Sequence, residues 1–313
     1  MTPRPLIIDT DPGQDDAVAL LLALASPEEL EVRAVTSVAG NVPLELTTEN
    51  ALSIVELASR DDVPVFAGCA RPMVKELFTA EYVHGATGLD GAKLPKTTRS
   101  VAEGHAIDAI IEILRASDDA GVTLCVLGPL TNVAMAMVKA PDILGSIREL
   151  VLMGGGFFEG GNVTPAAEFN IYVDPHAAHV VFTSGVPLVM MPLDVTHKAL
   201  ATPARVKAFA DLGTTPGDVV AGMIEFSMRH DLEKYGGAGA PLHDPSVIAY
   251  LLEPDLYGGR RCRVDIETAP GPTQGMTLVD WWGTTDGEPN AMVINEVDHE
   301  RFFRLLVERV ARL

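Results

Sequence analysis

The chain has few basic residues, few cysteines and no long uncharged hydrophobic run. Its 23 lysines and arginines stand against 43 aspartates and glutamates, which gives a formal net charge of −20. Such a field repels phosphate backbones, so a nucleic-acid polymer is not expected as a partner, whereas a small neutral ligand or a cation is allowed. No segment is both long and charge-free enough to span a bilayer, so no membrane partner is expected either.

The three cysteines, Cys69, Cys125 and Cys262, are widely separated and form no C-x-x-C pair. Cys69 and Cys125 lie in apolar, strand-like surroundings and are expected to be small core residues in a reducing compartment. The first residues, "MTPRP", lead directly into a strand-like run without the basic region and extended apolar core of a signal peptide. We therefore expect a soluble cytoplasmic protein.

Strand-like and helix-like segments alternate over roughly the first two hundred residues, a pattern typical of an α/β fold with a mostly parallel, Rossmann-like sheet flanked by helices. Predicted strands include "PLIID" at 5–9, "VTLCVLG" at 122–128 and "PLVMMPLDVT" at 187–196. Near the C-terminus, "CRVDIET" and "GMTLVDWW" predict an extra hairpin. The sequence contains no repeat, low-complexity tract or linker, so we expect a single domain over residues 1–313.

Six polar segments follow predicted strands or begin predicted helices of this fold. In such a sheet, ligands bind outside the carboxyl ends of the strands, so we expect these segments to meet at one edge. They are "DTDPGQDD" at 9–16, "AGN" at 39–41, "HGATGLDG" at 84–91, "LGPLTN" at 127–132, "GGGFFEGGNVTPAAEFN" at 154–170 and "HDP" at 243–245.

The first segment places Asp9, Asp11, Asp15 and Asp16 within eight positions. Acids in the first turn of a helix stabilise it by about 0.3–1 kcal/mol each, which accounts for one or two of them. Helix capping does not account for Asp9 and Asp11, which precede the turn. The crowding favours a hard cation, and Ca²⁺ takes about six to eight oxygen ligands in flexible geometry.

The stretch "DTDPGQDDA" resembles the N-terminal signature of the inosine–uridine-preferring nucleoside hydrolases, calcium-dependent enzymes that cleave the N-glycosidic bond of ribonucleosides. The other five segments occur in the order of that family, so the resemblance extends over most of the chain. It implies an enzyme of nucleoside catabolism or salvage that acts on a small ribonucleoside. It also implies a homotetramer or dimer.

The resemblance also implies a set of site residues. Its Ca²⁺ ligands would be the side chains of Asp11, Asp16 and Asp244 and the backbone carbonyl of Leu127. Asp244 is alternatively the N-cap of a helix that begins at Pro245, and one carboxylate can serve in both ways. The implied ribose contacts are Asp15, Asn41, Asn162, Glu168 and Asn170.

Two of these ribose contacts depend on their local context. Turn chemistry beside Gly161 explains Asn162 equally well, because Asn next to Gly commonly hydrogen-bonds its own backbone. Glu168 and Asn170 stand next to a strand-like "IYV" at 171–173 with no glycine nearby, which favours a binding function.

Glycoside cleavage passes through an oxocarbenium-like centre that water attacks on the face opposite the leaving base. We assign Asp11 as the general base for a metal-activated water and His243 as the leaving-group acid. The chain has no G-x-S-x-G nucleophile elbow, so no covalent nucleophile is expected. His84, Phe169 and Tyr235 are candidate contacts to the nucleobase. Tyr235 slightly favours pyrimidine nucleosides such as uridine and cytidine, with inosine also possible.

Two other functions remain open at this stage. An Asp-x-Asp pair after a strand is also typical of Mg²⁺-dependent phosphatases, although four acids would repel a phosphate group. A non-catalytic module that binds ribose and Ca²⁺ would keep the same pocket without turnover. Retention of both Asp11 and His243 argues against that second function.

Overall fold

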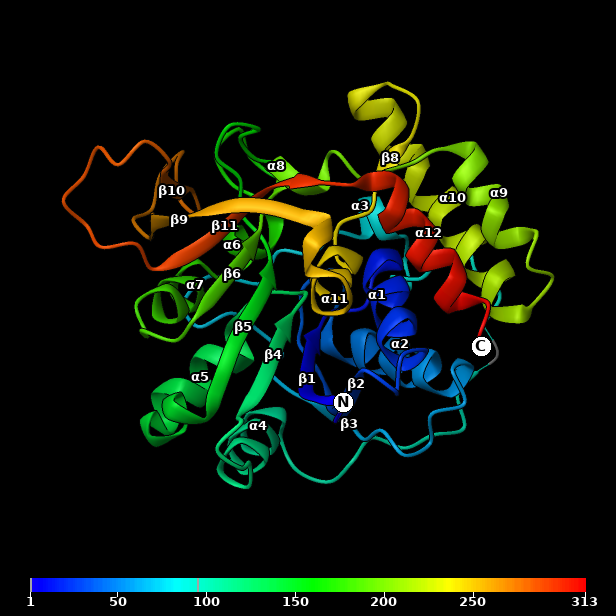
Figure 1. Cartoon of the computed structure of the whole chain (residues 1–313), viewed down its shortest axis with the longest axis horizontal. Coiled ribbons are helices and arrows are strands. Elements are labelled where there is room, and N and C mark those ends of the chain that lie inside the picture. The colour runs from blue at the N-terminus through cyan, green and yellow to red at the C-terminus, as the bar shows by residue number, and fades with distance from the viewer. Residues whose placement is uncertain (1, 95) are drawn as a thin grey trace.

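A nine-stranded sheet runs through the computed structural model, which describes residues 2–94 and 96–313 apart from the side chains of Asp231 and Tyr235 (Figure 1). Its strands lie in the order β10-β9-β11-β6-β5-β4-β1-β2-β3. Neighbours from β3 to β11 are parallel, whereas β9 pairs antiparallel with both β11 and β10. The strands are β1 (Arg4–Thr10), β2 (Leu30–Ser37), β3 (Val65–Ala67), β4 (Val122–Val126), β5 (Ile147–Met153), β6 (Leu188–Met191), β9 (Tyr257–Ile266), β10 (Thr277–Asp280) and β11 (Ala291–Val297).

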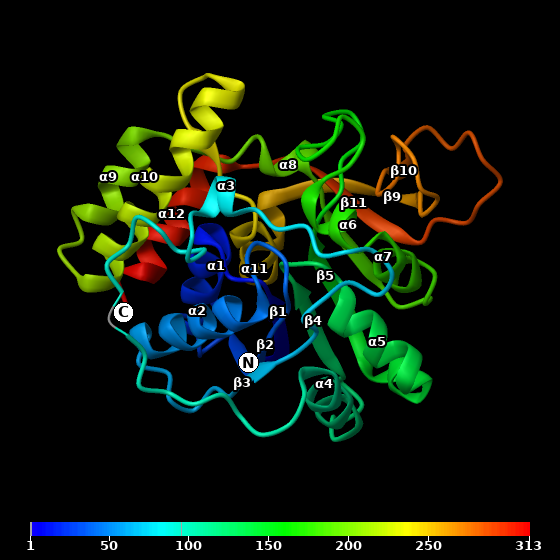
Figure 2. The ribbon, with the colours of Figure 1, turned by 180° about the vertical axis from the view of Figure 1, so that it is seen from behind.

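Helices cover both faces of this sheet, as the two opposite views show (Figures 1 and 2). One face carries α1 (Gln14–Leu24), α2 (Leu44–Leu57), α9 (Pro203–Ala210), α10 (Thr215–Tyr235), α11 (Pro245–Leu252) and α12 (His299–Val310). The other face carries α4 (Ala106–Arg115), α5 (Thr131–Lys139) and α7 (Pro175–Phe182). The remaining elements are the short helices α3 (Glu81–His84), α6 (Phe169–Val173) and α8 (Leu193–Thr196), the 3₁₀ helices η1 (Pro141–Ser146) and η2 (Pro254–Leu256), and the paired strands β7 (Leu200–Ala201) and β8 (Ala240–Pro241).

The continuous apolar runs of the strands follow from burial on both faces. In β1, Leu6 and Ile8 belong to one core cluster, whereas Ile7 between them belongs to the other. Successive side chains of a strand point to opposite faces, so a strand between two helical layers needs apolar residues at every position. Helix α1 is apolar all round because it contacts α2, α10, α11 and α12 as well as the sheet.

The predicted α/β class and the hairpin of β9 and β10 are confirmed, and the hairpin extends the main sheet beyond β11. One predicted strand is wrong, and another is shorter than predicted. The "IYV" segment belongs to α6, because the Glu168 side chain accepts hydrogen bonds from the backbone N–H groups of Asn170 and Ile171 and so caps a helix. The strand predicted at 187–196 ends at Met191, because Pro192 has no N–H to donate and α8 follows it.

The described residues contain no helix that is long and apolar enough to cross a membrane. Cys125 and Cys262 are buried, and Cys69 is partly buried.

The order of the strands changes direction at β1, which lies between β2 and β4. The crevice beyond the carboxyl ends of β1 and β4 is the place where ligands bind in sheets of this type. The Asn132 side chain, at the start of α5, ties three strand ends together beneath this crevice. Its Nδ2 donates to Asp9 Oδ1 (2.8 Å) and to the Ser37 carbonyl (3.0 Å), while its Oδ1 accepts from the N–H of Cys69 (2.8 Å).

Replacing Asn132 with Ala should therefore destabilise the fold. The change leaves buried groups on Asp9, Ser37 and Cys69 short of a hydrogen bond, and each such group costs about 1–3 kcal/mol. We expect the free energy of unfolding, measured by urea denaturation, to fall by about 3 kcal/mol. Val138→Ala on the exposed side of the same helix is the control and should change it by less than about 0.5 kcal/mol. Equal stability of the two variants would contradict this function of Asn132.

Candidate active site

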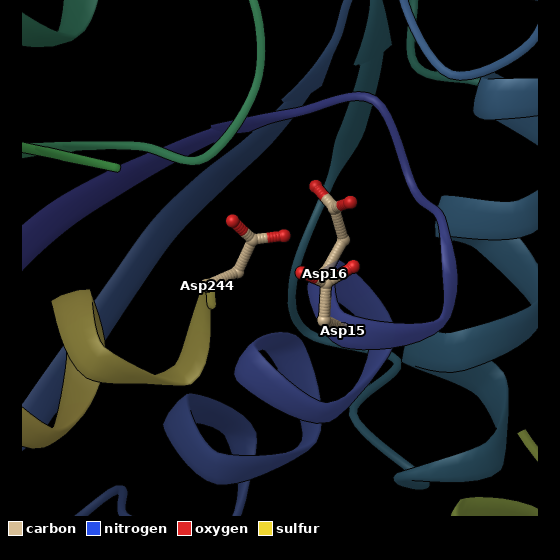
Figure 3. Close-up of side chains that lie close together, drawn as sticks. All are labelled: Asp15, Asp16 and Asp244. Carbon is tan, nitrogen blue, oxygen red and sulfur yellow. The ribbon is translucent and has the colours of Figure 1, made fainter. Parts of the chain in front are cut away.

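Three carboxylates from two helices meet beyond the end of β1. Asp15 and Asp16 lie in the first turn of α1, and Asp244 precedes α11, which packs against α1. Figure 3 shows the three side chains facing a common space. One oxygen from each lies within 4.8 Å of the others, a separation at which a single cation can contact all three. The cluster therefore contains Asp15, which the resemblance assigned to the ribose, beside the expected ligands Asp16 and Asp244.

Asp11 is fully buried beside this cluster, with its carboxylate held between two glycines. A Cβ atom at either Gly40 or Gly128 would collide with the carboxylate oxygens of Asp11. Its Oδ2 accepts from the backbone N–H of Asn41 (2.7 Å). Its Oδ1 is buried without a hydrogen-bond partner among the described residues, which is costly for a carboxylate in the absence of a bound cation or water.

Burial raises the pKa values of all three fully buried aspartates near the cluster. The pKa values of Asp11 and Asp244 lie well above the usual value, first because of burial and then because of neighbouring carboxylates. Burial, followed by the charge of Asp15, raises the pKa of Asp16 to about 6, against the opposing hydrogen bonds from Thr10 and Gly13. A divalent cation would favour the charged carboxylates and so oppose the effects of burial and of mutual repulsion. A ligand set made of oxygen atoms alone suits Ca²⁺ or Mg²⁺. The residues present therefore fit a hard cation.

Helix capping explains one of these acids. Asp16 Oδ2 accepts from the Gly13 N–H (3.0 Å) in a capping box, and its Oδ1 accepts from the Thr10 hydroxyl. Asp244 occupies the N-cap position of α11, but its side chain makes no capping hydrogen bond within the described part of the chain. Asp244 is therefore the N-cap residue of α11 by position, as predicted, while its carboxylate is turned toward the cluster (Figure 3).

An open pocket of about 850 Å³ lies over the cluster and brings together segments from all six sequence motifs. Asp11 and Asp16 are buried beneath it. The candidate residues that line it are Asp15, Asn41, His84, Leu127, Asn162, Glu168, Phe169, Asn170, His243 and Asp244. The prediction for Tyr235 concerns a side chain outside the described residues.

Asn41 and Asn170 hold the backbone and carboxylates at the bottom of the pocket. Asn41 Nδ2 donates to the Asp11 carbonyl (3.1 Å) and to Asp16 Oδ2 (3.2 Å), so its amide oxygen remains as an acceptor. Asn170 Nδ2 donates to the carbonyl of Leu127 (2.7 Å). A carbonyl oxygen has two lone pairs, so Leu127 keeps one for a cation.

Glu168 and Asn162 shape the loop that leads into α6. The Glu168 carboxylate accepts from the N–H groups of Gly155 (2.9 Å) and Asn170 (3.0 Å), and burial raises its pKa to about 7. Asn162 Oδ1 accepts from the N–H of Phe169 (2.9 Å), seven residues further along the chain. The Asn162 side chain thus fixes the loop to α6 through a backbone group outside its own turn.

The comparisons with known proteins agree over almost the whole chain. The family model described as inosine-uridine preferring nucleoside hydrolase matches residues 6–304. The chain belongs to this family. It is similar to the pyrimidine-specific ribonucleoside hydrolase RihA of Salmonella typhi, with 47% identity over 98% of each chain.

Solved structures of the same family have the same fold. A purine-preferring ribonucleoside hydrolase from Gardnerella vaginalis matches with a TM-score of 0.91 and 33% identity over 98% of each chain. The plant nucleoside hydrolase PpNRh1 matches with a TM-score of 0.91 and 35% identity over 99% of each chain. This nucleoside hydrolase is therefore an N-glycosidase. The two alternative functions, a phosphatase and a non-catalytic binding module, are thus wrong.

Burial favours the neutral form of both histidines of this hydrolase that were assigned to the pocket. Burial lowers the pKa of His243 to about 4, against the opposing charge of Asp15. Its Nδ1 lies 2.7 Å from the Thr196 hydroxyl, and its ring is 5.8 Å from that of His197. Burial also lowers the pKa of His84.

Several pocket residues of the hydrolase were missed from the sequence. Ser227, His230 and Lys234 of α10 line the pocket opposite Tyr82 of α3, whose ring lies 5.6 Å from that of His230. Lys234 Nζ donates to the Asn162 carbonyl (2.5 Å) and so joins α10 to the opposite loop. Their spacing of three and four residues places these α10 residues on one face of the helix. This polar face was the feature of the sequence that could have indicated them.

The close fit of Asp11 predicts that Gly128→Ala disrupts catalysis. The new Cβ must displace the Asp11 carboxylate, and a misplacement of about 1 Å in an active site costs about a hundredfold in rate. We expect kcat/KM for uridine to fall by about that factor. Gly145→Ala is the matched control, because a Cβ there meets nothing within 4 Å, and it should retain full activity. An active Gly128→Ala variant would show that Asp11 need not stay in this position.

Proposed function

We propose that this enzyme is a Ca²⁺-dependent ribonucleoside hydrolase that prefers pyrimidine nucleosides such as uridine and cytidine. The observation that carries the proposal is the cluster of three aspartate carboxylates at a pocket that segments from all six motifs line. The similarity to a pyrimidine-specific RihA supports the preference for pyrimidines. The homotetramer or dimer that the resemblance implies remains a prediction.

Asp11, Asp16, Asp244 and the Leu127 carbonyl would hold the cation, and Asp15 is close enough to contribute an oxygen. A bound Ca²⁺ would neutralise the crowded carboxylates and make a neighbouring water more acidic. The ribose hydroxyls would bind to Asp15 and to the free amide oxygen of Asn41. This end of the pocket then fixes the sugar and leaves the nucleobase toward the mouth.

Asp11 is proposed as the general base. Its Oδ1 has no hydrogen-bond partner among the described residues, so it can accept a proton from the attacking water. Water then adds to the anomeric carbon on the face opposite the nucleobase. Negative carboxylates near the sugar ring stabilise the positive charge that develops on it.

The other side of the ribose faces the loop before α6. Asn162, Glu168 and Asn170 are proposed to contact the 3′ and 5′ side of the sugar. Both Glu168 oxygens already accept from backbone N–H groups, so a ribose hydroxyl would bind to their remaining lone pairs. These contacts would orient the sugar, because hydrogen bonds to the backbone hold the three side chains in place.

His243 is proposed to assist departure of the nucleobase. Because the ring is neutral in the free pocket, it acts by donating its one N–H to a base atom on which negative charge develops. Phe169 would line the apolar wall beside the base, where its ring lies 6.3 Å from that of Phe78. Tyr235 remains a candidate base contact on the family resemblance alone.

The proposed function predicts a distinct pattern of ribose release. In a reducing-sugar assay, uridine and cytidine should give a kcat/KM about tenfold or more above that of inosine and adenosine, equivalent to about 1.4 kcal/mol. EDTA should abolish the activity, and added Ca²⁺ should restore it. A purine preference would overturn the base assignment, and activity that survives EDTA would overturn the cation dependence.

The function of His243 predicts a dependence on the leaving group. His243→Ala should slow uridine cleavage by about a hundredfold, a typical contribution of acid assistance. It should affect p-nitrophenyl riboside far less, because that leaving group departs without such assistance. The exposed His179→Ala on α7 is the matched control and should leave both substrates unaffected. Equal losses on both substrates would show that His243 does not act on the leaving group.

A further inference from the structure

Gln14 stands among the acids of "DTDPGQDD", yet the hydrogen bonds of its side chain go to residues 84 and 90. It is 1% exposed at the start of α1 and reaches toward α3. Its Nε2 donates to two backbone carbonyls, those of His84 (3.0 Å) and Asp90 (3.1 Å). Its Oε1 lies 2.6 Å from His84 Nδ1. Gln14 thus joins the first helix to the histidine that lines the pocket.

These contacts determine which nitrogen of His84 carries its proton. The amide nitrogen of Gln14 has two hydrogens, and both are used on carbonyl oxygens, which can only accept. The opposite orientation of the amide would place Oε1 against those two carbonyls, so it is excluded. Oε1 can only accept, so the hydrogen bond between it and Nδ1 needs a proton on Nδ1.

Burial lowers the pKa of His84 and so favours the neutral ring, which carries a single proton. The charge of Asp15 opposes this effect, and His230 of α10 adds to it. With the proton on Nδ1, Nε2 has a free lone pair and acts as a hydrogen-bond acceptor.

The His84 ring is also held in place by its packing against Gly13. A Cβ atom at Gly13 would lie 2.5 Å from Nδ1 and 2.7 Å from Cε1 of His84, so the ring packs directly on the backbone of this glycine. Nδ1 faces Gln14, and Nε2 is on the other side of the ring. Because His84 lines the pocket, Nε2 is the nitrogen available to a ligand.

We propose that Gln14 is a positioning residue that keeps His84 protonated on Nδ1, so that Nε2 accepts a hydrogen bond from an N–H or O–H group of the bound nucleoside. The identity of the ligand rests on the proposed function, whereas the tautomer is a property of the free protein. Donors of this class in uridine include N3–H of the base and the 5′-hydroxyl. A ligand with a lone pair at this place would be repelled.

The tautomer can be measured without any substrate. Nitrogen NMR of the ¹⁵N-histidine-labelled enzyme distinguishes a protonated from an unprotonated ring nitrogen, and loss of one signal set in His84→Phe assigns that residue. We expect Nδ1 of His84 to be protonated and Nε2 to be unprotonated at pH 7. A proton on Nε2 would overturn the proposal, and this result does not depend on whether the chain cleaves nucleosides.

The contribution of Gln14 is tested by Gln14→Met, which keeps a similar volume and removes the acceptor. Proton occupancy should shift away from Nδ1 of His84, and kcat/KM for uridine should fall about tenfold, mostly through KM, because a uniform binding interaction is lost. Gln274→Met removes a comparable bond, from Nε2 to the Thr268 carbonyl, at a side chain that does not line the pocket, and should change neither quantity. An unchanged His84 tautomer in Gln14→Met would overturn the positioning function of Gln14. If that variant does not fold, the measurement on the unsubstituted enzyme still decides the tautomer.

Two modified substrates identify the donor that meets Nε2. 3-Methyluridine lacks N3–H, and 5′-deoxyuridine lacks the 5′-hydroxyl. The one that removes the true donor should have a raised KM in the unsubstituted enzyme, with little further increase in Gln14→Met. If both analogues bind as well as uridine, no substrate donor meets Nε2 and the proposal is overturned.

Discussion

The site depends on the cost of burying several like charges in one place. Asp11, Asp16 and Asp244 are fully or nearly fully buried, and burial together with mutual repulsion disfavours their charged forms. Such a cluster persists only because the rest of the fold contributes more free energy of folding than the cluster costs. The hydrogen bonds from Thr10, Gly13 and Asn41 offset part of this cost, and a cation would offset the remainder.

The parallel sheet supplies the geometry for this cluster. The change of direction at β1 opens a crevice, and the loops after β1, β2 and β4 enter it from different sides. Glycines at positions 40 and 128 give the space that the Asp11 carboxylate occupies, and Asn132 ties the strand ends below it. Helix α11 then brings Asp244 from a distant part of the chain to α1. The site therefore combines loops that follow strands with the first turn of α1 and the start of α11.

Much of this could be predicted from the sequence, because the motifs are local and their place in an α/β fold is fixed by the strands before them. The "IYV" segment was predicted incorrectly because its β-branched residues favour a strand, whereas the side chain of Glu168 caps a helix there. The inclusion of Asp15 in the carboxylate cluster depends on how α11 packs on α1. The contact between Gln14 and His84 likewise joins elements far apart in the chain, so no local pattern indicates it.

The packing of His84 on Gly13 has a consequence for how this protein can vary. Any residue other than glycine at position 13 needs room that the imidazole occupies. A larger residue there requires His84 to move or to be replaced by a smaller residue, and the pocket wall then changes shape. The two positions are therefore expected to change as a pair among related sequences, although they belong to different motifs.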